Sequence, residues 1–231
     1  MDRLDSEGAS FSRAYANCPI CTPSRGTIFS GRHAHAGPVA GFFDVFIPTA
    51  PSTATELRKA GYHTTYFGKW HLGEDTLPQH GFTEWRSVED NKIEDDLPFS
   101  SYHNYLLSKG YKPDQNSKFF GLKDKTSKDY ASRDIFSVEF RASLTVEDQM
   151  ASFLGKEASE FIDNNKDEPF VLYVSTFEPH SPYSGPLNGL YDPEKLPVGP
   201  SFLKKPEGVS EFNRVRSEYF MQYLEGGDIS S

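Results

Sequence analysis

The clearest pattern along the chain is a helical one over residues 146–164. Apolar residues recur there at spacings of three and four, at Val146, Met150, Phe153, Leu154, Ala158, Phe161 and Ile162. This spacing places them on one face of an α-helix. A continuous apolar run follows over residues 169–175, and such a run is typical of a strand buried on both faces of a sheet. We therefore expect a helix that leads into a buried strand.

An earlier helix and strand repeat this order. Residues 52–60 predict a helix that Gly61 closes, because glycine readily takes the left-handed conformation that ends many helices. Residues 62–67 are rich in β-branched and aromatic side chains and predict a strand. A helix followed by a strand thus occurs twice, which favours a mostly parallel sheet flanked by helices. The predicted fold class is α/β.

Two more helices and one insertion complete the expected organisation. Thr22 offers a capping hydroxyl, Pro23 suits a first helical position, and Gly31 is a plausible end for this helix. A last helix is expected over 212–224. The polar, lysine-rich stretch 87–141 is interpreted as an insertion over the core, either a lid or a plain surface excursion.

The composition limits the classes of partner. The 231 residues carry a net charge of -9 and are 36% hydrophobic, with 19 Phe and 12 Tyr, which suits a folded domain with an aromatic core. The acidic balance argues against nucleic acid as a partner. No apolar stretch approaches the roughly 20 residues of a membrane span, and residues 1–7 do not resemble a signal peptide. These features leave the compartment open.

Candidate chemistry begins at Cys21 and Arg25, at the start of the predicted helix. A helix N-terminus presents free amides and the positive end of the dipole, so it suits an anion and would activate a cysteine. Arg25 lies four residues on and can occupy the same side of the first turn. Alternatively, Arg25 forms a salt bridge with one of the 33 acidic residues.

Basic residues also follow the two predicted strands. Lys69 and His71 come after the first strand and would point the same way if the chain stays extended. His180 comes after the second strand. Ligands of open parallel sheets bind beyond the carboxyl ends of the strands, so these residues are expected to converge at one rim. Taken singly, each has an ordinary interpretation: a solvated lysine or a loop histidine.

The two cysteines allow other interpretations. Cys18 and Cys21 could form a redox pair, although no strand is evident before them. With His33 and His35 they could bind zinc, but the single residue between the two histidines is unusually tight for that.

Taken together, the segments resemble the formylglycine-dependent (type I) sulfatases. The family signature Cys-x-Pro-Ser-Arg, followed shortly by Thr/Ser-Gly-Arg, matches residues 21–25 and 30–32. A second signature resembles residues 57–73, and a strand followed by Pro-His-x-Pro resembles residues 170–182. The extended stretch that comes next in many members resembles residues 191–206. The resemblance thus spans nearly the whole chain outside the predicted insertion.

The resemblance implies an alkaline-phosphatase-like sulfatase fold and a sulfuric ester hydrolase. A formylglycine-generating enzyme would oxidise Cys21 to formylglycine, whose hydrate attacks sulfur and expels the alcohol. Cys21 would also contact a divalent cation, calcium or alternatively magnesium. The substrate would be a sulfated small molecule or carbohydrate. Family members are secreted, periplasmic or lysosomal, which is the implied localisation.

The resemblance also assigns roles in the site. Arg25 would hold the hydrated aldehyde and the metal-site carboxylates, and His71 would orient the hydrate. Lys69 and His180 would bind sulfate oxygens. Protonation of the leaving alcohol would fall to Lys69 or His180, and the choice stays open.

Two departures from the family pattern matter. Only 20 residues precede Cys21, without the apolar strand and paired aspartates that ligate the metal, and the later ligands normally follow the point where residue 231 stands. Residues 1–231 are therefore expected to be a partial catalytic domain, lacking N- and C-terminal parts, with impaired metal binding and turnover. The alternatives are a phosphonate or phosphate-ester hydrolase of the same superfamily, or a non-catalytic anion-binding remnant.

Overall fold

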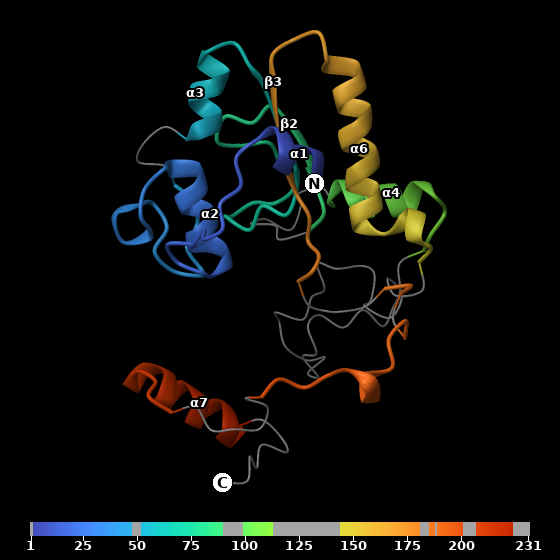
Figure 1. The fold of residues 1–231 in the computed structure, drawn as a ribbon. Helices are drawn as coiled ribbons and strands as arrows, with labels where there is room; N and C mark the ends of the chain where they lie inside the picture. Colours follow the sequence, from blue (N-terminus) through green and yellow to red (C-terminus); the bar gives the residue numbers. More distant parts are fainter. Residues whose placement is uncertain are drawn as a thin grey trace. The chain divides into compact units, whose positions relative to one another are not determined.

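A three-stranded parallel sheet organises the first part of the chain. The computed structural model describes residues 2–47, 52–89, 99–112, 144–180, 185–187, 189–200 and 207–223. They fall into two units, residues 1–186 and 187–231. The sheet belongs to the first unit and has the strand order β2-β1-β3 (Figure 1), with β1 at His63–Gly68, β2 at Glu84–Ser87 and β3 at Phe170–Ser175.

Strand β1 is the buried centre of the sheet. Its residues from Thr64 to Gly68 are buried, as expected of a β-branched and aromatic strand with neighbours on both sides. Gly68 stands opposite Ser87 of β2 and Ser175 of β3, so the three strands end at a common rim. The parallel sheet and its helices confirm the predicted α/β class.

Helices cover the two faces of this sheet. In Figure 1, α2 (Cys21–Ser30) and α3 (Thr53–Lys59) lie on one side, whereas α4 (Ser101–Ser108) and α6 (Met150–Asn165) lie on the other. Tyr66 packs with Phe29 of α2, and Phe67 packs with Phe161 of α6. Neighbouring side chains of β1 thus pack against opposite faces of the sheet, because side chains alternate along a strand. A shorter helix, α1 (Asp2–Glu7), precedes them.

Two expectations about these elements are corrected. Helix α2 begins at Cys21 with Ile20 as its N-cap, and the Thr22 hydroxyl donates to the Phe42 carbonyl 2.8 Å away instead of capping the helix. The β3 strand is only half-buried, with Val174 42% exposed, because β3 lies outside β1 in the strand order. Gly31 does end α2, in the left-handed conformation at φ 66°.

The expected insertion is only partly within the described residues. Val88 and helix α4 lie in its first part, and Tyr102 and Leu106 of α4 are buried in the same cluster as α6. Residues 90–98 and 113–143 lie outside the described residues, so the extent of the insertion stays a prediction. Asp148, just before α6, anchors this region by accepting hydrogen bonds from the Tyr105 and Tyr111 hydroxyls at 2.6 and 2.7 Å. These hydrogen bonds link α4 to the turn that precedes α6.

The second unit contains the last predicted helix. Helix α7 spans Glu211–Tyr223, after a 3-10 turn at Pro193–Lys195.

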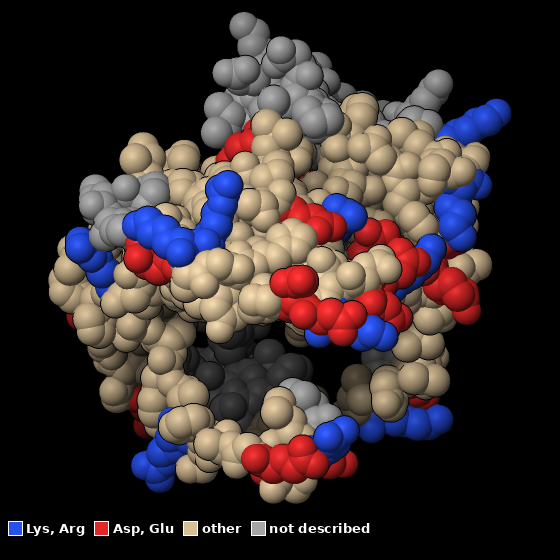
Figure 2. Space-filling model, turned by 90° about the horizontal axis from the view of Figure 1, so that it is seen from above, with Lys and Arg blue, Asp and Glu red and all other residues tan. Residues whose placement is uncertain are grey.

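None of the described helices is long and apolar enough to cross a membrane. On the face drawn in Figure 2, Lys and Arg side chains are interspersed with Asp and Glu side chains.

Candidate active site

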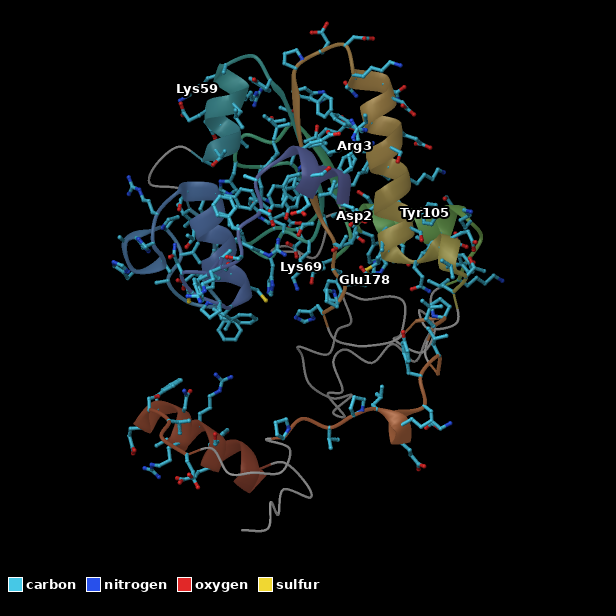
Figure 3. The ribbon with its side chains drawn as sticks, in the orientation of Figure 1. Asp2, Arg3, Lys59, Lys69, Tyr105 and Glu178 are labelled. Atoms are coloured by element: carbon cyan, nitrogen blue, oxygen red, sulfur yellow. The ribbon has the colours of Figure 1, made fainter. Side chains whose placement is uncertain are left out.

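The rim where the strands end is built around Gly68. Its φ of 115° is unfavourable for other residues, and a Cβ there would lie 1.9 Å from the Ser175 carbonyl oxygen. Glycine therefore permits β1 and β3 to meet closely, and the Lys69 amide donates to that same carbonyl at 2.9 Å. Figure 3 shows Lys69 at this end of the strands, on the same side as Glu178, which follows β3. The close approach thus fixes the place where Lys69 leaves the sheet.

Four predicted residues line one pocket at this rim: Cys21, Arg25, Lys69 and His180. The pocket has a volume of about 460 Å³, and its remaining lining comes from Pro19, Ile20, Ser24, Ile28, Tyr173, Thr176 and Phe177. Cys21 is half-buried in the first turn of α2. The structure thus brings the cysteine at a helix N-terminus together with three basic side chains.

Arg25 reaches from α2 to both neighbouring strands. Its Nη1 donates to the Lys69 carbonyl at 2.6 Å, the Ser175 hydroxyl at 3.0 Å and the Tyr66 hydroxyl at 3.1 Å. All three acceptors are neutral, so these bonds orient the guanidinium without cancelling its charge. Tyr66 in turn donates to the Lys69 carbonyl. Burial raises the pKa of Tyr66, so its hydroxyl stays neutral.

The Lys69 side chain is buried, with 5% of its surface exposed. Its Nζ lies 3.5 Å from Glu89 Oε1 and 4.6 Å from the centre of the Phe177 ring. A carboxylate and an aromatic face both favour an ammonium ion. Burial raises the pKa of Glu89, and the nearby Lys69, Arg25 and His180 oppose that rise. The lysine is therefore held in place from two directions.

His71 departs from the extended geometry that was expected after β1. Its φ is 56°, its amide donates to Asp75 Oδ1 at 2.8 Å, and its ring packs edge-on against Phe42. It is not among the residues that line the pocket. Burial, together with the positive charges of Lys69 and Arg25, lowers its pKa to about 4. His71 thus lies near the other predicted residues as a neutral imidazole at pH 7.

The buried side of the His71 ring carries an unused polar atom. Its Nδ1 has no hydrogen-bond partner among the described residues. Such an atom is costly to bury and often marks a place where a ligand or a modified group binds. His180, by contrast, lines the pocket directly, with its amide bonded to the Phe177 carbonyl at 3.1 Å and its ring against that of Phe177.

The alternative interpretations of the cysteines gain no support. Cys18 and Cys21 are not bonded to each other. His33 and His35 stack with ring centres 5.7 Å apart, but the described residues hold no group of three or more His, Cys, Asp or Glu side chains that could bind a metal. The same finding applies to calcium, which needs about 6–8 oxygen ligands. The described residues around Cys21 therefore do not fit a divalent cation by themselves.

Sequence reasoning missed three residues of this site: Tyr66, Ser175 and Glu89. The first two hold Arg25, and both were inside predicted strands, so only the pairing of β1 with β3 could have revealed them. Glu89 follows β2, a four-residue strand that was not predicted. Its position beside Lys69 depends on that strand and carries no local signal in the sequence.

Comparison with known proteins identifies the family of this chain. The sequence profile described as Sulfatase matches residues 1–198, most of the chain. The chain belongs to the sulfatase family. It is 27% identical over 224 residues to an ulvan-active sulfatase of Formosa agariphila, and 25% identical over 223 residues to an N-acetylgalactosamine-6-O-sulfatase of Bacteroides thetaiotaomicron. These alignments cover 91% and 79% of this sulfatase chain, but only 36% and 43% of the relatives.

Solved structures support the fold. A phosphonate monoester hydrolase from Silicibacter pomeroyi matches with a TM-score of 0.56 and 23% identity, over 80% of this chain and 37% of that one. A Bacteroides thetaiotaomicron protein described with the metabolism of multiple glycosaminoglycans matches with a TM-score of 0.52 and 21% identity, over 80% and 46% of the two chains. These likenesses confirm the predicted alkaline-phosphatase-like sulfatase fold, and at this identity they do not indicate which reaction the chain catalyses.

Proposed function

We propose that this sulfatase chain carries the nucleophile-bearing half of a sulfuric ester hydrolase, with Cys21 as the precursor of the nucleophile. The observation that carries the proposal is the shared pocket of Cys21, Arg25, Lys69 and His180. A sulfate ester is a tetrahedral monoanion, and this pocket offers two permanent cations and a helix N-terminus beside a single modifiable side chain. The overall reaction adds water to the ester and yields an alcohol, inorganic sulfate and a proton.

Cys21 suits the modification that the family resemblance implies. It is half-buried at the first turn of α2, opens into the pocket and is not engaged in a disulfide. Oxidised to formylglycine by a formylglycine-generating enzyme and then hydrated, it would supply one hydroxyl that attacks the sulfur atom and expels the alcohol. The second hydroxyl would then expel inorganic sulfate and restore the aldehyde. The unused Nδ1 of His71 is the polar atom proposed to orient that hydroxyl.

The other residues bind and position the ester. Arg25, fixed by three neutral acceptors, is proposed to contact both the modified side chain and a sulfate oxygen. Lys69 and His180 line the pocket and would bind further oxygens. Either can give a proton to the leaving alcohol, since both carry exchangeable protons at the same cavity. His71 stays neutral above its lowered pKa, so one of its ring nitrogens can accept a hydrogen bond at physiological pH.

The class of substrate rests on the relatives. One of them is named an N-acetylgalactosamine-6-O-sulfatase, which favours a sulfated carbohydrate over a simple alkyl sulfate as the substrate of this chain. Family members use a divalent cation, calcium or alternatively magnesium. Because the described residues do not fit a cation by themselves, no step of the proposal is assigned to one.

A single-turnover assay tests the proposed function. The chain would be made together with a formylglycine-generating enzyme and mixed, in excess, with an aryl sulfate and separately with an aryl phosphonate monoester. We expect inorganic sulfate to be released from the aryl sulfate by the unchanged protein and not by Cys21→Ala. Cys18→Ala is the matched control and should release sulfate normally. Release from the phosphonate alone would favour the phosphonate hydrolase, and release from neither would favour an anion-binding remnant.

A further inference from the structure

Glu89 places a carboxyl group behind a pocket whose lining includes Arg25, Lys69 and His180. It follows β2, and Val88 before it is buried in the core cluster of α4 and α6, which fixes the direction in which the chain leaves the strand. Its side chain is 15% exposed, and Oε1 lies 3.5 Å from Lys69 Nζ. The carboxylate does not line the pocket, but it contacts a side chain that does.

The carboxylate is incompletely neutralised by its surroundings. The distance to Lys69 is an ion-pair distance, longer than the roughly 2.7–2.9 Å of a charge-assisted hydrogen bond. Its second oxygen, Oε2, is buried and has no hydrogen-bond partner among the described residues. The basic side chains that act on Glu89 are Lys69, Arg25 and His180, the same residues that would bind the anion. An anion in the pocket therefore shares its cations with a buried carboxylate.

The charge of the bound anion then decides how strongly Glu89 opposes it. Electrostatic repulsion is proportional to the charge of each partner, so a dianion is repelled twice as strongly as a monoanion of the same shape at the same place. A sulfate ester carries one negative charge, whereas inorganic sulfate carries two. The same difference separates a sulfate ester from a phosphate monoester, which is mostly a dianion at neutral pH.

We propose that Glu89 is a specificity-determining residue that makes the pocket prefer monoanionic esters over tetrahedral dianions, and so favours release of the sulfate product. This inference rests on the proposed function, because it assumes that the pocket binds a sulfuryl group. Glu89 acts through its charge and through Lys69, without touching the ester. It would lower the affinity for product more than the affinity for substrate.

Binding of two small anions to the 231-residue chain tests this role without any hydrolysis. Inorganic sulfate is the dianion and sulfamate is the monoanion, and dissociation constants come from amide shifts in the first turn of α2 at low, constant ionic strength and pH 8. If the charge of Glu89 weakens monoanion binding about threefold, it weakens dianion binding about tenfold. Glu89→Gln should therefore tighten sulfate about tenfold and sulfamate about threefold.

The matched control is Glu84→Gln, in the strand that precedes Glu89, because Glu84 pairs with Arg86 and His63 instead of Lys69. It should leave both dissociation constants unchanged. Glu89→Met, neutral and of similar size, is a second variant in case the first does not fold. Lowering the pH protonates Glu89. The difference in dissociation constants between the unchanged chain and Glu89→Gln should therefore shrink as the pH falls.

The outcomes separate this inference from the proposed function. Equal changes for sulfate and sulfamate, or no change for either, would overturn the role of Glu89 while leaving the anion pocket intact. Loss of both anions in Glu89→Gln would also overturn it, since the carboxylate would then be needed only to hold Lys69. If the unchanged chain binds neither anion, the pocket itself is wrong and both proposals fall.

Discussion

At the residue scale, the site depends on a half-buried guanidinium held by neutral groups and on a buried ring nitrogen without a hydrogen-bond partner among the described residues. Arg25 is fixed by three neutral oxygens and keeps its charge for a ligand. His71 keeps one ring nitrogen without a partner among the described residues. Such groups lower the stability of a fold, and proteins retain them where they interact with a ligand or a modified side chain. These two residues are therefore better explained by function than by folding.

The lowered pKa of His71 predicts a pH dependence of stability. In the unfolded chain this histidine takes up a proton near pH 6.5, whereas in the folded chain it resists protonation until about pH 4. The unfolded state thus binds more protons in this window, so the free energy of unfolding falls as the pH drops from 6.5 to 4. His71→Gln removes this contribution. Over this pH window, the free energy of unfolding of the variant should fall by about 1 kcal/mol less than that of the unchanged protein, after discounting for the partial exposure of the ring.

Urea unfolding at pH 7 and pH 4.5 measures this difference. His33→Gln is the control, because His33 is exposed in a turn away from the sheet. It should follow the unchanged protein at both pH values. A His71→Gln protein that loses as much stability as the unchanged one would show that the fold does not lower the pKa of His71, which would contradict its burial as a neutral imidazole.

At the scale of the elements, the meeting of β1 and β3 controls the site. Lys69 leaves β1 and binds the Ser175 carbonyl at the end of β3, and Arg25 of α2 reaches both. The pocket therefore depends on the register of these two strands, which places Gly68 opposite Ser175.

Gly68→Ala tests this dependence. The new methyl group would lie 1.9 Å from the Ser175 carbonyl oxygen, so the strands must separate or shift. We expect a loss of about 3 kcal/mol or more in the free energy of unfolding, together with loss of anion binding. Gly61→Ala is the matched control, since Gly61 also has a positive φ, of 90°, but a Cβ there meets no described atom within 4 Å. It should cost only about 1 kcal/mol. Equal effects of the two variants would refute the claim that close strand approach builds the site.

The elements also show how far the sequence could predict this protein. Strong periodicity identified α6, and the segment 52–67 identified α3 and β1, because these elements bury a regular apolar pattern. Strand β2 was missed, since four residues are too few to establish a period. Strand β3 looked like a central strand from its apolar run, yet it lies beside a single described neighbour. Burial of a strand depends on its partners, which a local pattern does not specify.

In the candidate site, too, some residues could be predicted from the sequence and others could not. Cys21, Arg25, Lys69 and His180 could be named in advance because their order and spacing resemble a family signature. Tyr66, Ser175 and Glu89 could not, because their importance arises from contacts across 41 or more positions, or from an unpredicted strand. The catalytic roles themselves stay predictions.

At the scale of the whole molecule, an acidic chain presents a locally basic pocket. The net charge is -9, while the pocket is lined by Arg25, Lys69 and His180. Excess negative charge elsewhere weakens long-range attraction of anions, so selectivity has to come from short-range contacts at the rim. The chain also spans less than half the length of the curated relatives described above. Turnover by residues 1–231 therefore stays part of the proposal.

The central claim is that Cys21 is the residue converted into the nucleophile, and peptide mass spectrometry tests it most directly. The chain is made with a formylglycine-generating enzyme and digested with trypsin, which yields the peptide from Ala14 to Arg25 containing both Cys18 and Cys21. We predict fragment ions with an aldehyde or its hydrate at Cys21 and an unchanged thiol at Cys18, since only Cys21 has Pro23 and Arg25 at the signature offsets. An aldehyde at Cys18, or two unchanged thiols, would contradict the account.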